Sequence, residues 1–107
     1  VFMELNESLK NEIVKRPQKI SPARIFLFGS FASGKPTKDS DIDLLIIKDK
    51  ISSKIRETVE ARKMLKGILM PFDTIVASQE EFDFYKNQIN TIYFEADKRG
   101  VMIYERK

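Results

Sequence analysis

The feature that most restricts the fold of this chain is a pair of short apolar runs joined by a glycine–serine turn and a polar segment. Arg24 to Phe28 form the first run, and Asp41 to Ile47 form the second. Short apolar runs bounded by glycine and polar residues are typical of β-strands. We therefore predict two strands here, with the turn and the polar segment between them.

Two carboxylates open the second of these strands. Successive side chains on a strand point to opposite faces, so Asp41 and Asp43 should share one face. Their mutual repulsion disfavours this arrangement unless a cation lies between them. Mg²⁺ is bound in proteins by one or two carboxylates, with water and substrate phosphates completing its shell. A structural Asp-x-Asp is more often found in a turn or at a helix start, so the pattern favours a metal site.

The turn after the first strand has the properties of a phosphate-binding turn. Gly29 permits a positive φ and a close backbone approach to a ligand. If a helix begins at Ser30, its free N–H groups face whatever binds there. Gly29, Gly34 and Lys35 also match most of a P-loop, but Pro36 stands where that motif needs Ser or Thr for the metal. We reject the P-loop interpretation.

The remaining pattern alternates helices with strands. Asp73 lies inside one predicted strand, either as a solvent-facing edge residue or as a third carboxylate beside Asp41 and Asp43. Between residues 51 and 66, apolar residues at helical spacing predict a helix that covers one face of the sheet with Ile51, Ile55, Val59 and Met64/Leu65. We expect an α/β (α+β) fold with helices at 3–15, 51–66, 78–85 and 91–99, and further strands at 72–77 and 101–104.

Composition limits the chemistry open to the chain. Its 107 residues predict a single domain, 1–107, and no apolar run approaches the ~20 residues of a membrane span. With no histidine and no cysteine, imidazole bases, thiolate zinc and disulfides are excluded. We expect a cytoplasmic protein without a membrane partner. The net charge of +3 is interleaved with acidic residues, so nucleic acid is an open alternative that the pattern does not favour.

The motif resembles that of a known family. Gly29-Ser30, Gly34 and Ser40-Asp41-Ile42-Asp43-Leu44 are similar to the signature of the DNA polymerase beta-like nucleotidyltransferases, in particular their minimal nucleotidyltransferase (MNT) branch. The likeness spans nearly the whole chain. It implies the nucleotidyltransferase fold, a small mixed β-sheet flanked by helices. It also implies catalytic and metal-ligating roles for Asp41, Asp43 and Asp73, nucleotide contacts from Gly29, Ser30 and Ser40, and two Mg²⁺ ions.

The resemblance further implies a function. Small stand-alone members often act as antitoxins beside a helical HEPN-type toxin, transferring AMP from ATP to a tyrosine of that partner. Two alternatives stay open: a non-catalytic antitoxin with a vestigial nucleotide site, and a nucleotidyltransferase acting on nucleic acid. One departure bears on activity, because many members carry Arg where this chain has Ser33.

Overall fold

The fold is built on one mixed β-sheet. The computed structural model describes residues 6–37 and 39–107. Its four strands lie in the order β3-β2-β1-β4, with β1 antiparallel to both β2 and β4, and β2 parallel to β3. The strands are β1 (Arg24–Phe28), β2 (Ile42–Lys48), β3 (Phe72–Ser78) and β4 (Val101–Glu105). A mixed sheet flanked by helices is the fold class predicted from the sequence, and that prediction is confirmed.

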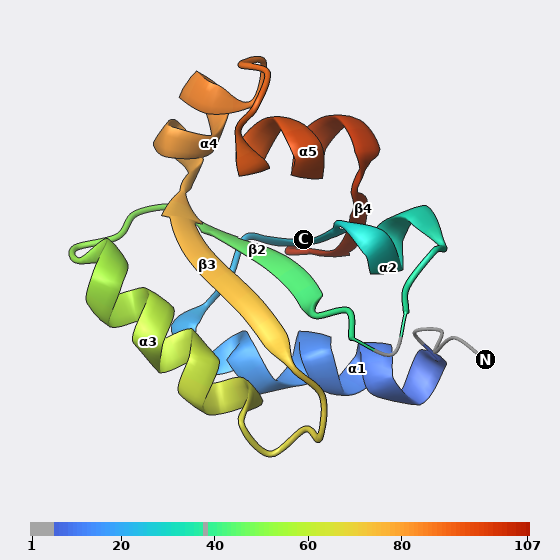
Figure 1. Ribbon diagram of the computed structural model, residues 1–107. Helices are drawn as coiled ribbons and strands as arrows, with labels where there is room; N and C mark the ends of the chain where they lie inside the picture. Colours follow the sequence, from blue (N-terminus) through green and yellow to red (C-terminus); the bar gives the residue numbers. More distant parts are fainter. Residues whose placement is uncertain (1–5, 38) are drawn as a thin grey trace.

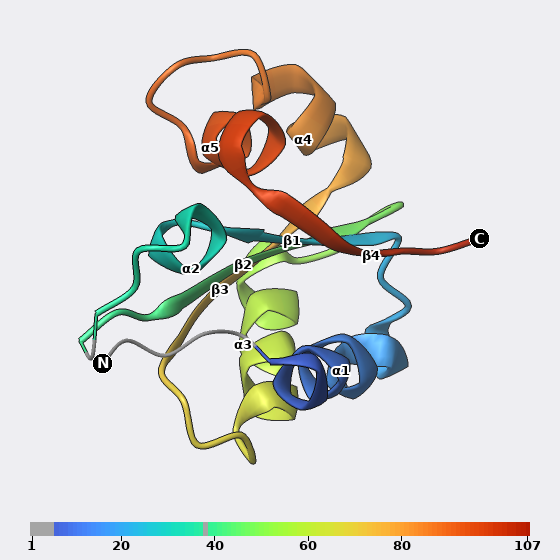
Figure 2. The same ribbon diagram turned by 90° about the vertical axis from the view of Figure 1, so that its right-hand side faces the viewer.

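Helices cover both faces of this sheet (Figures 1 and 2). On one face lie α1 (Glu7–Lys15), the 3₁₀ helix η1 (Arg16–Ile20) and α3 (Lys54–Leu65). On the other lie α4 (Gln79–Tyr85) and α5 (Ile92–Arg99), whereas the four-residue α2 (Ser30–Ser33) follows the end of β1 and packs Phe31 with the core of the α1 and α3 side. The parallel β2–β3 pair is connected through α3, because parallel neighbours need a crossover of this kind.

Strand β2 lies inside the sheet and contributes to both halves of the core. Ile42, Leu44 and Ile46 pack with the residues of α1 and α3, whereas Leu45 and Ile47 pack with Phe82 of α4 and with α5. All five of these strand residues are fully buried. A strand buried on both faces reads as a continuous apolar run, which explains why this segment was recognisable in the sequence.

Helix ends are stabilised by side-chain caps. The Ser78 hydroxyl accepts a hydrogen bond from the Glu81 amide at 3.1 Å, and Thr91 does the same for Phe94 at 3.1 Å. Asn6 begins α1, since its side chain accepts from the Leu9 amide at 2.8 Å. The predicted helix at 3–15 is confirmed from Glu7 onward, and its residues 3–5 lie outside the described part of the chain.

One detail of the helices differs from expectation. The predicted inward face of α3 is right only in part: Leu65 is buried, and Ile51 and Met64 pack against the core, but Ile55 is 81% exposed and Val59 41%. Glu57 and Ala61 turn inward in their place, because Glu57 has hydrogen-bond partners inside. After α1 the chain continues into η1, where proline occupies one of the first two positions, which do not need the N–H that proline lacks.

Across residues 6–37 and 39–107, every helix is too short or too polar to cross a lipid bilayer.

Candidate active site

The predicted site residues gather at one end of the sheet, where β2 and β3 begin. Asp43 is the second residue of β2 and Asp73 the second of β3, and the two are partners in the register of this parallel pair. Paired residues on neighbouring strands point to the same face of a sheet. That face is the one covered by α4 and α5, since Leu45 and Ile47 belong to the same alternating set as Asp43 and pack with residues of these helices.

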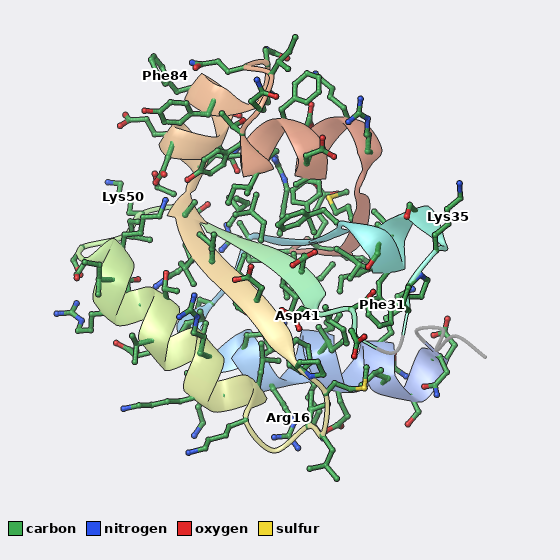
Figure 3. The ribbon with its side chains drawn as sticks, in the orientation of Figure 1. Arg16, Phe31, Lys35, Asp41, Lys50 and Phe84 are labelled. Atoms are coloured by element: carbon green, nitrogen blue, oxygen red, sulfur yellow. The ribbon has the colours of Figure 1, made fainter. Side chains whose placement is uncertain are left out.

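Asp41 lies just outside the strand. We predicted it as the first residue of the strand, but β2 begins at Ile42, and Asp41 is exposed at the end of the loop before it (Figure 3). Its charge nevertheless acts on Asp43. The structure therefore brings Asp41, Asp43 and Asp73 to one end of the sheet, with only two of them on strands.

The Asp43 carboxyl has an unusual protonation equilibrium. Its pKa is raised from 3.8 to about 6, first by burial and then by the negative charges of Asp73 and Asp41. Within the described residues it makes no ion pair or hydrogen bond that would offset these effects. A half-buried carboxyl without a partner is costly, so this position is arranged for a cation or proton that residues 6–37 and 39–107 do not supply.

The backbone of Gly29 closes one side of Asp43. Phe28, the last residue of β1, is the register partner of Asp43, so Gly29 follows directly beside the carboxyl. A Cβ atom at Gly29 would lie 2.1 Å from Asp43 Oδ2, and the glycine has a φ of +75°. Only glycine fits here, both for space and for backbone conformation.

The short helix α2 begins at Ser30, as the sequence predicted. Gly29 is its N-cap, and Gly34, with a φ of +77°, closes it. The Gly29 carbonyl accepts from the amides of Ala32 and Ser33, both at 3.1 Å. The turn therefore presents its backbone at the same end of the sheet as the carboxylates. Ser33, where many relatives have Arg, is exposed, and its hydroxyl donates to the Ser30 carbonyl at 3.0 Å.

Ser40 lies in the loop that leads into β2. Its hydroxyl accepts a hydrogen bond from the Thr37 amide at 2.8 Å, and its own amide donates to the Thr37 carbonyl at 3.1 Å. These contacts fix the loop immediately before Asp41. The nucleotide contact predicted for Ser40 stays a prediction, as does that for Gly29 and Ser30.

Asp73 has one cationic neighbour that sequence reasoning missed. β3 is an edge strand, and the Asp73 side chain is 60% exposed, 4.0 Å from the guanidinium of Arg62 on α3. The Nε of Arg62 donates to the Thr74 carbonyl at 3.1 Å, which holds the side chain along the outer edge of β3. The pairing depends on how α3 packs against β3, and no local pattern in the sequence indicates it.

The carboxylates are suitable ligands for a divalent metal, but they do not form a complete coordination shell by themselves. No group of three or more Asp, Glu, His or Cys side chains in residues 6–37 and 39–107 is close enough to hold a metal ion by itself. Mg²⁺ sites of the phosphate-transfer type need only one or two carboxylates, because substrate phosphates and water supply the other ligands. Asp43, which has no partner among the described residues and is flanked by two further carboxylates, meets this requirement.

Comparison with known proteins identifies the class. The model of the nucleotidyltransferase domain family matches residues 8–99, so the chain belongs to this family. The match includes the Gly-Ser turn, all three aspartates and Ser40. The resemblance inferred from the motif is therefore confirmed. Members of the family use a nucleoside triphosphate and a divalent metal. No curated protein sequence matches the chain.

Solved structures with the same fold include toxin–antitoxin complexes and another nucleotidyltransferase. A toxin–antitoxin crystal structure with AMP-PNP matches with a TM-score of 0.64 and 20% identity, over 92% of this chain and 74% of that one. A nucleotidyltransferase structure from Sulfolobus solfataricus matches with 0.63 and 24%, over 92% and 79%. A tri-AMPylated Shewanella oneidensis HEPN toxin in complex with MNT antitoxin gives 0.55 and 17%, over 91% and 70%. At these identities the matches establish the fold.

Proposed function

We propose that this protein is a metal-dependent nucleotidyltransferase that transfers AMP from ATP to a tyrosine hydroxyl of a HEPN-type toxin, for which it serves as antitoxin. The observation that carries the proposal is the placement of Asp43 and Asp73 as register partners, with the Gly29 backbone against Asp43. The fold shared with toxin–antitoxin structures, one of them with AMP-PNP, supports this choice of donor and partner.

Each residue has a separate task in this mechanism. Gly29 and Ser30 bind the triphosphate through their backbone and hydroxyl, and Ser40 holds the adjoining loop against the nucleotide. Asp41 and Asp43 would hold both Mg²⁺ ions, and Asp73 would hold one of them. Bound there, the ions would supply positive charge to the α-phosphate and to the departing pyrophosphate.

The transfer itself exchanges one phosphorus–oxygen bond for another. The acceptor oxygen forms a bond to the α-phosphorus while the bond from that phosphorus to the bridging oxygen of pyrophosphate breaks. Asp73 orients the acceptor hydroxyl and accepts its proton, which then passes to water. Its 60% exposed carboxylate on the edge strand is open to an incoming acceptor.

The test is an Asp73→Asn variant supplied with ATP labelled at the α-phosphate, Mg²⁺ and the HEPN-type partner. We expect nucleotide binding to persist and transfer to fall about 10²–10⁴-fold, the usual contribution of a positioned base. Asp83→Asn, at an exposed position on α4, is the matched control and should transfer normally. Full turnover by Asp73→Asn would contradict the assignment.

The same assay separates the competing functions. Label on the partner identifies an enzyme, whereas inhibition of the partner without label identifies a binding module with a vestigial nucleotide site. The intact carboxylates argue against the second outcome. A nucleic-acid enzyme would instead bind RNA or DNA with a strong dependence on salt concentration, because binding would release counterions from the phosphates.

A further inference from the structure

The order of the site residues across the sheet predicts the direction from which the acceptor arrives. Gly29 follows β1, Asp43 lies on β2 and Asp73 lies on the edge strand β3. In phosphoryl transfer the attacking and leaving oxygens are roughly in line. If pyrophosphate leaves over Gly29 and Ser30, as the proposed function requires, the acceptor must approach from the β3 side.

On that side lies the loop between α3 and β3, which exposes apolar side chains. Leu69 at its tip is 97% exposed. The loop is bound to the start of β2, since the Pro71 carbonyl accepts a hydrogen bond from the Ile42 amide at 2.9 Å. Next to the loop is an open cavity of about 260 Å³, lined by Arg62, Leu65, Lys66, Ile68, Met70 and Phe72.

The charge around this cavity is positive. Arg62 and Lys66 are its charged lining residues in the described part of the chain, and both side chains are exposed. Arg62 also lies 4.0 Å from Asp73, so the cavity and the third carboxylate share one side chain. An apolar floor with a cationic rim is complementary to a polypeptide bearing apolar and acidic side chains. A nucleic-acid backbone would match only the rim.

We propose that Arg62, Lys66 and the segment from Gly67 to Phe72 bind the acceptor polypeptide beside Asp73. This acceptor-side surface recognises an acidic residue and an apolar residue next to the residue that carries the hydroxyl. The inference rests on the proposed function for the direction of approach. It adds a specificity surface outside the nucleotide and metal site.

The test uses short synthetic peptides, each with one tyrosine flanked by Glu and Leu, by Lys and Leu, or by Ser and Gly. Isotope-labelled protein with Mg²⁺ and an ATP analogue that has a methylene group between the α- and β-phosphorus, which the transfer cannot break, is titrated with each peptide and followed by amide NMR spectra. We expect the Glu–Leu peptide to shift the amides of Lys66 to Met70 and of Phe72. In parallel, transfer of labelled AMP to each peptide is measured with ATP.

Variants test charge and apolar contact separately. Lys66→Glu should lower kcat/KM for the Glu–Leu peptide about tenfold through KM and raise it for the Lys–Leu peptide, because like charges at a binding rim repel. Lys63→Glu makes the same charge change on the same helix, at an exposed position outside the cavity lining, and should change neither value. Leu69→Ser, at a fully solvated position, should weaken binding of both Leu-containing peptides without affecting the fold.

Different failures have different marks. The inference is overturned if the peptides shift amides elsewhere or none at all, or if Lys66→Glu leaves the peptide preference unchanged. It is also overturned if a short RNA, and not a peptide, shifts the loop amides. The proposed function fails separately, if no peptide receives AMP although the loop amides shift as expected.

Discussion

A carboxylate lies at each end of β2, and the two have opposite properties. Asp43 belongs to the strand itself, and Glu57 belongs to α3 and pairs with Lys48 of the strand. At the end where β2 begins, burial and two neighbouring carboxylates raise the pKa of Asp43 to about 6. At the other end, Lys48 pairs with Glu57 of α3, whose side chain is 8% exposed. The Lys48 ammonium and the amides of Ser53 and Ser52 hold the pKa of Glu57 down to about 2, against the opposing effect of burial.

The difference shows which of the two carboxylates is available to a ligand. Glu57 accepts from Lys48 and from the amides of Ser52 at 2.7 Å and Ser53 at 3.1 Å, so its charge is satisfied by the protein. Near Glu57, a second cluster of Lys54, Glu81 and Tyr93 joins α3, α4 and α5 in the same satisfied way. At the opposite end of β2, the charges that act on Asp43 from the described part of the chain are those of Asp73 and Asp41, both of its own sign. The first arrangement stabilises the fold. The second lowers the stability of the fold and leaves a carboxylate available to a ligand.

The largest effect on this comparison should come from removing the satisfied carboxylate. Glu57→Ala leaves Lys48, which is 19% exposed, without its partner and two amides without their acceptor. We expect the free energy of unfolding to fall by about 2–4 kcal/mol, as for other buried charged groups that lose a partner. Urea unfolding followed by circular dichroism measures it.

The matched control is Glu60→Ala on the same helix. Glu60 pairs with Arg56 at 3.6 Å, and both side chains are largely exposed. Exposed pairs contribute about 0–1 kcal/mol. Equal losses in the two variants would mean that the Lys48–Glu57 pair is no more important than a surface ion pair.

An intermediate effect is expected from closing the space beside Asp43. Gly29→Ala places a Cβ atom 2.1 Å from Asp43 Oδ2 at a φ of +75°. Strain of this kind costs about 1–3 kcal/mol, and Asp43 must also move, so binding of Mg²⁺ and AMP-PNP should weaken. Calorimetry measures the binding and urea unfolding the stability.

Gly34→Ala separates the clash from the backbone strain. Gly34 has a similar φ of +77°, but nothing lies within 4 Å of an added Cβ atom. It should lose about 1 kcal/mol of stability or less and keep its ligand affinity. If Gly29→Ala behaves in the same way, the close approach to Asp43 has no functional meaning.

Much of this architecture was predictable, for identifiable reasons. The strand Arg24–Phe28 was predicted with its observed bounds, because a short apolar run with a following glycine has few other interpretations. The buried face of α3 was predicted only in part. Helical spacing marked Leu65 correctly but also Ile55 and Val59, which are exposed, because burial of Glu57 depends on Lys48 and on amides that only the tertiary fold brings near. For the same reason Arg62 could not be connected with Asp73.

The site was predictable to a similar degree. Alternation along a strand and the family resemblance together predicted that Asp41, Asp43 and Asp73 would meet. The exact register, in which Asp43 faces Asp73, is a property of strand pairing that no local pattern specifies. The metal and nucleotide roles of these residues stay predictions until the variants are tested.

The smallest effect, and the one with a distinctive sign, is the stability cost of Asp43 itself. Its pKa is about 6 in the folded protein and near 3.8 when unfolded, so between these values the folded state binds a proton that the unfolded state does not. The Asp43 contribution to stability is therefore most favourable at low pH and falls as pH rises through this window. Asp43→Asn should raise the free energy of unfolding by about 1 kcal/mol at about pH 7.5 without metal, less than the pKa shift alone suggests, because the carboxyl is partly solvated.

At about pH 4 the gain from Asp43→Asn should vanish, since the wild-type carboxyl is then protonated in the folded protein. Glu57 acts in the opposite direction, because its lowered pKa means that stability is lost as pH falls from about 4.5 toward 2. Comparing urea unfolding at the two pH values, with Asp39→Asn as an exposed control for lost charge, isolates the Asp43 contribution. A variant that is less stable than the wild type at about pH 7.5 would mean that Asp43 has a partner and that the two ends of β2 are alike.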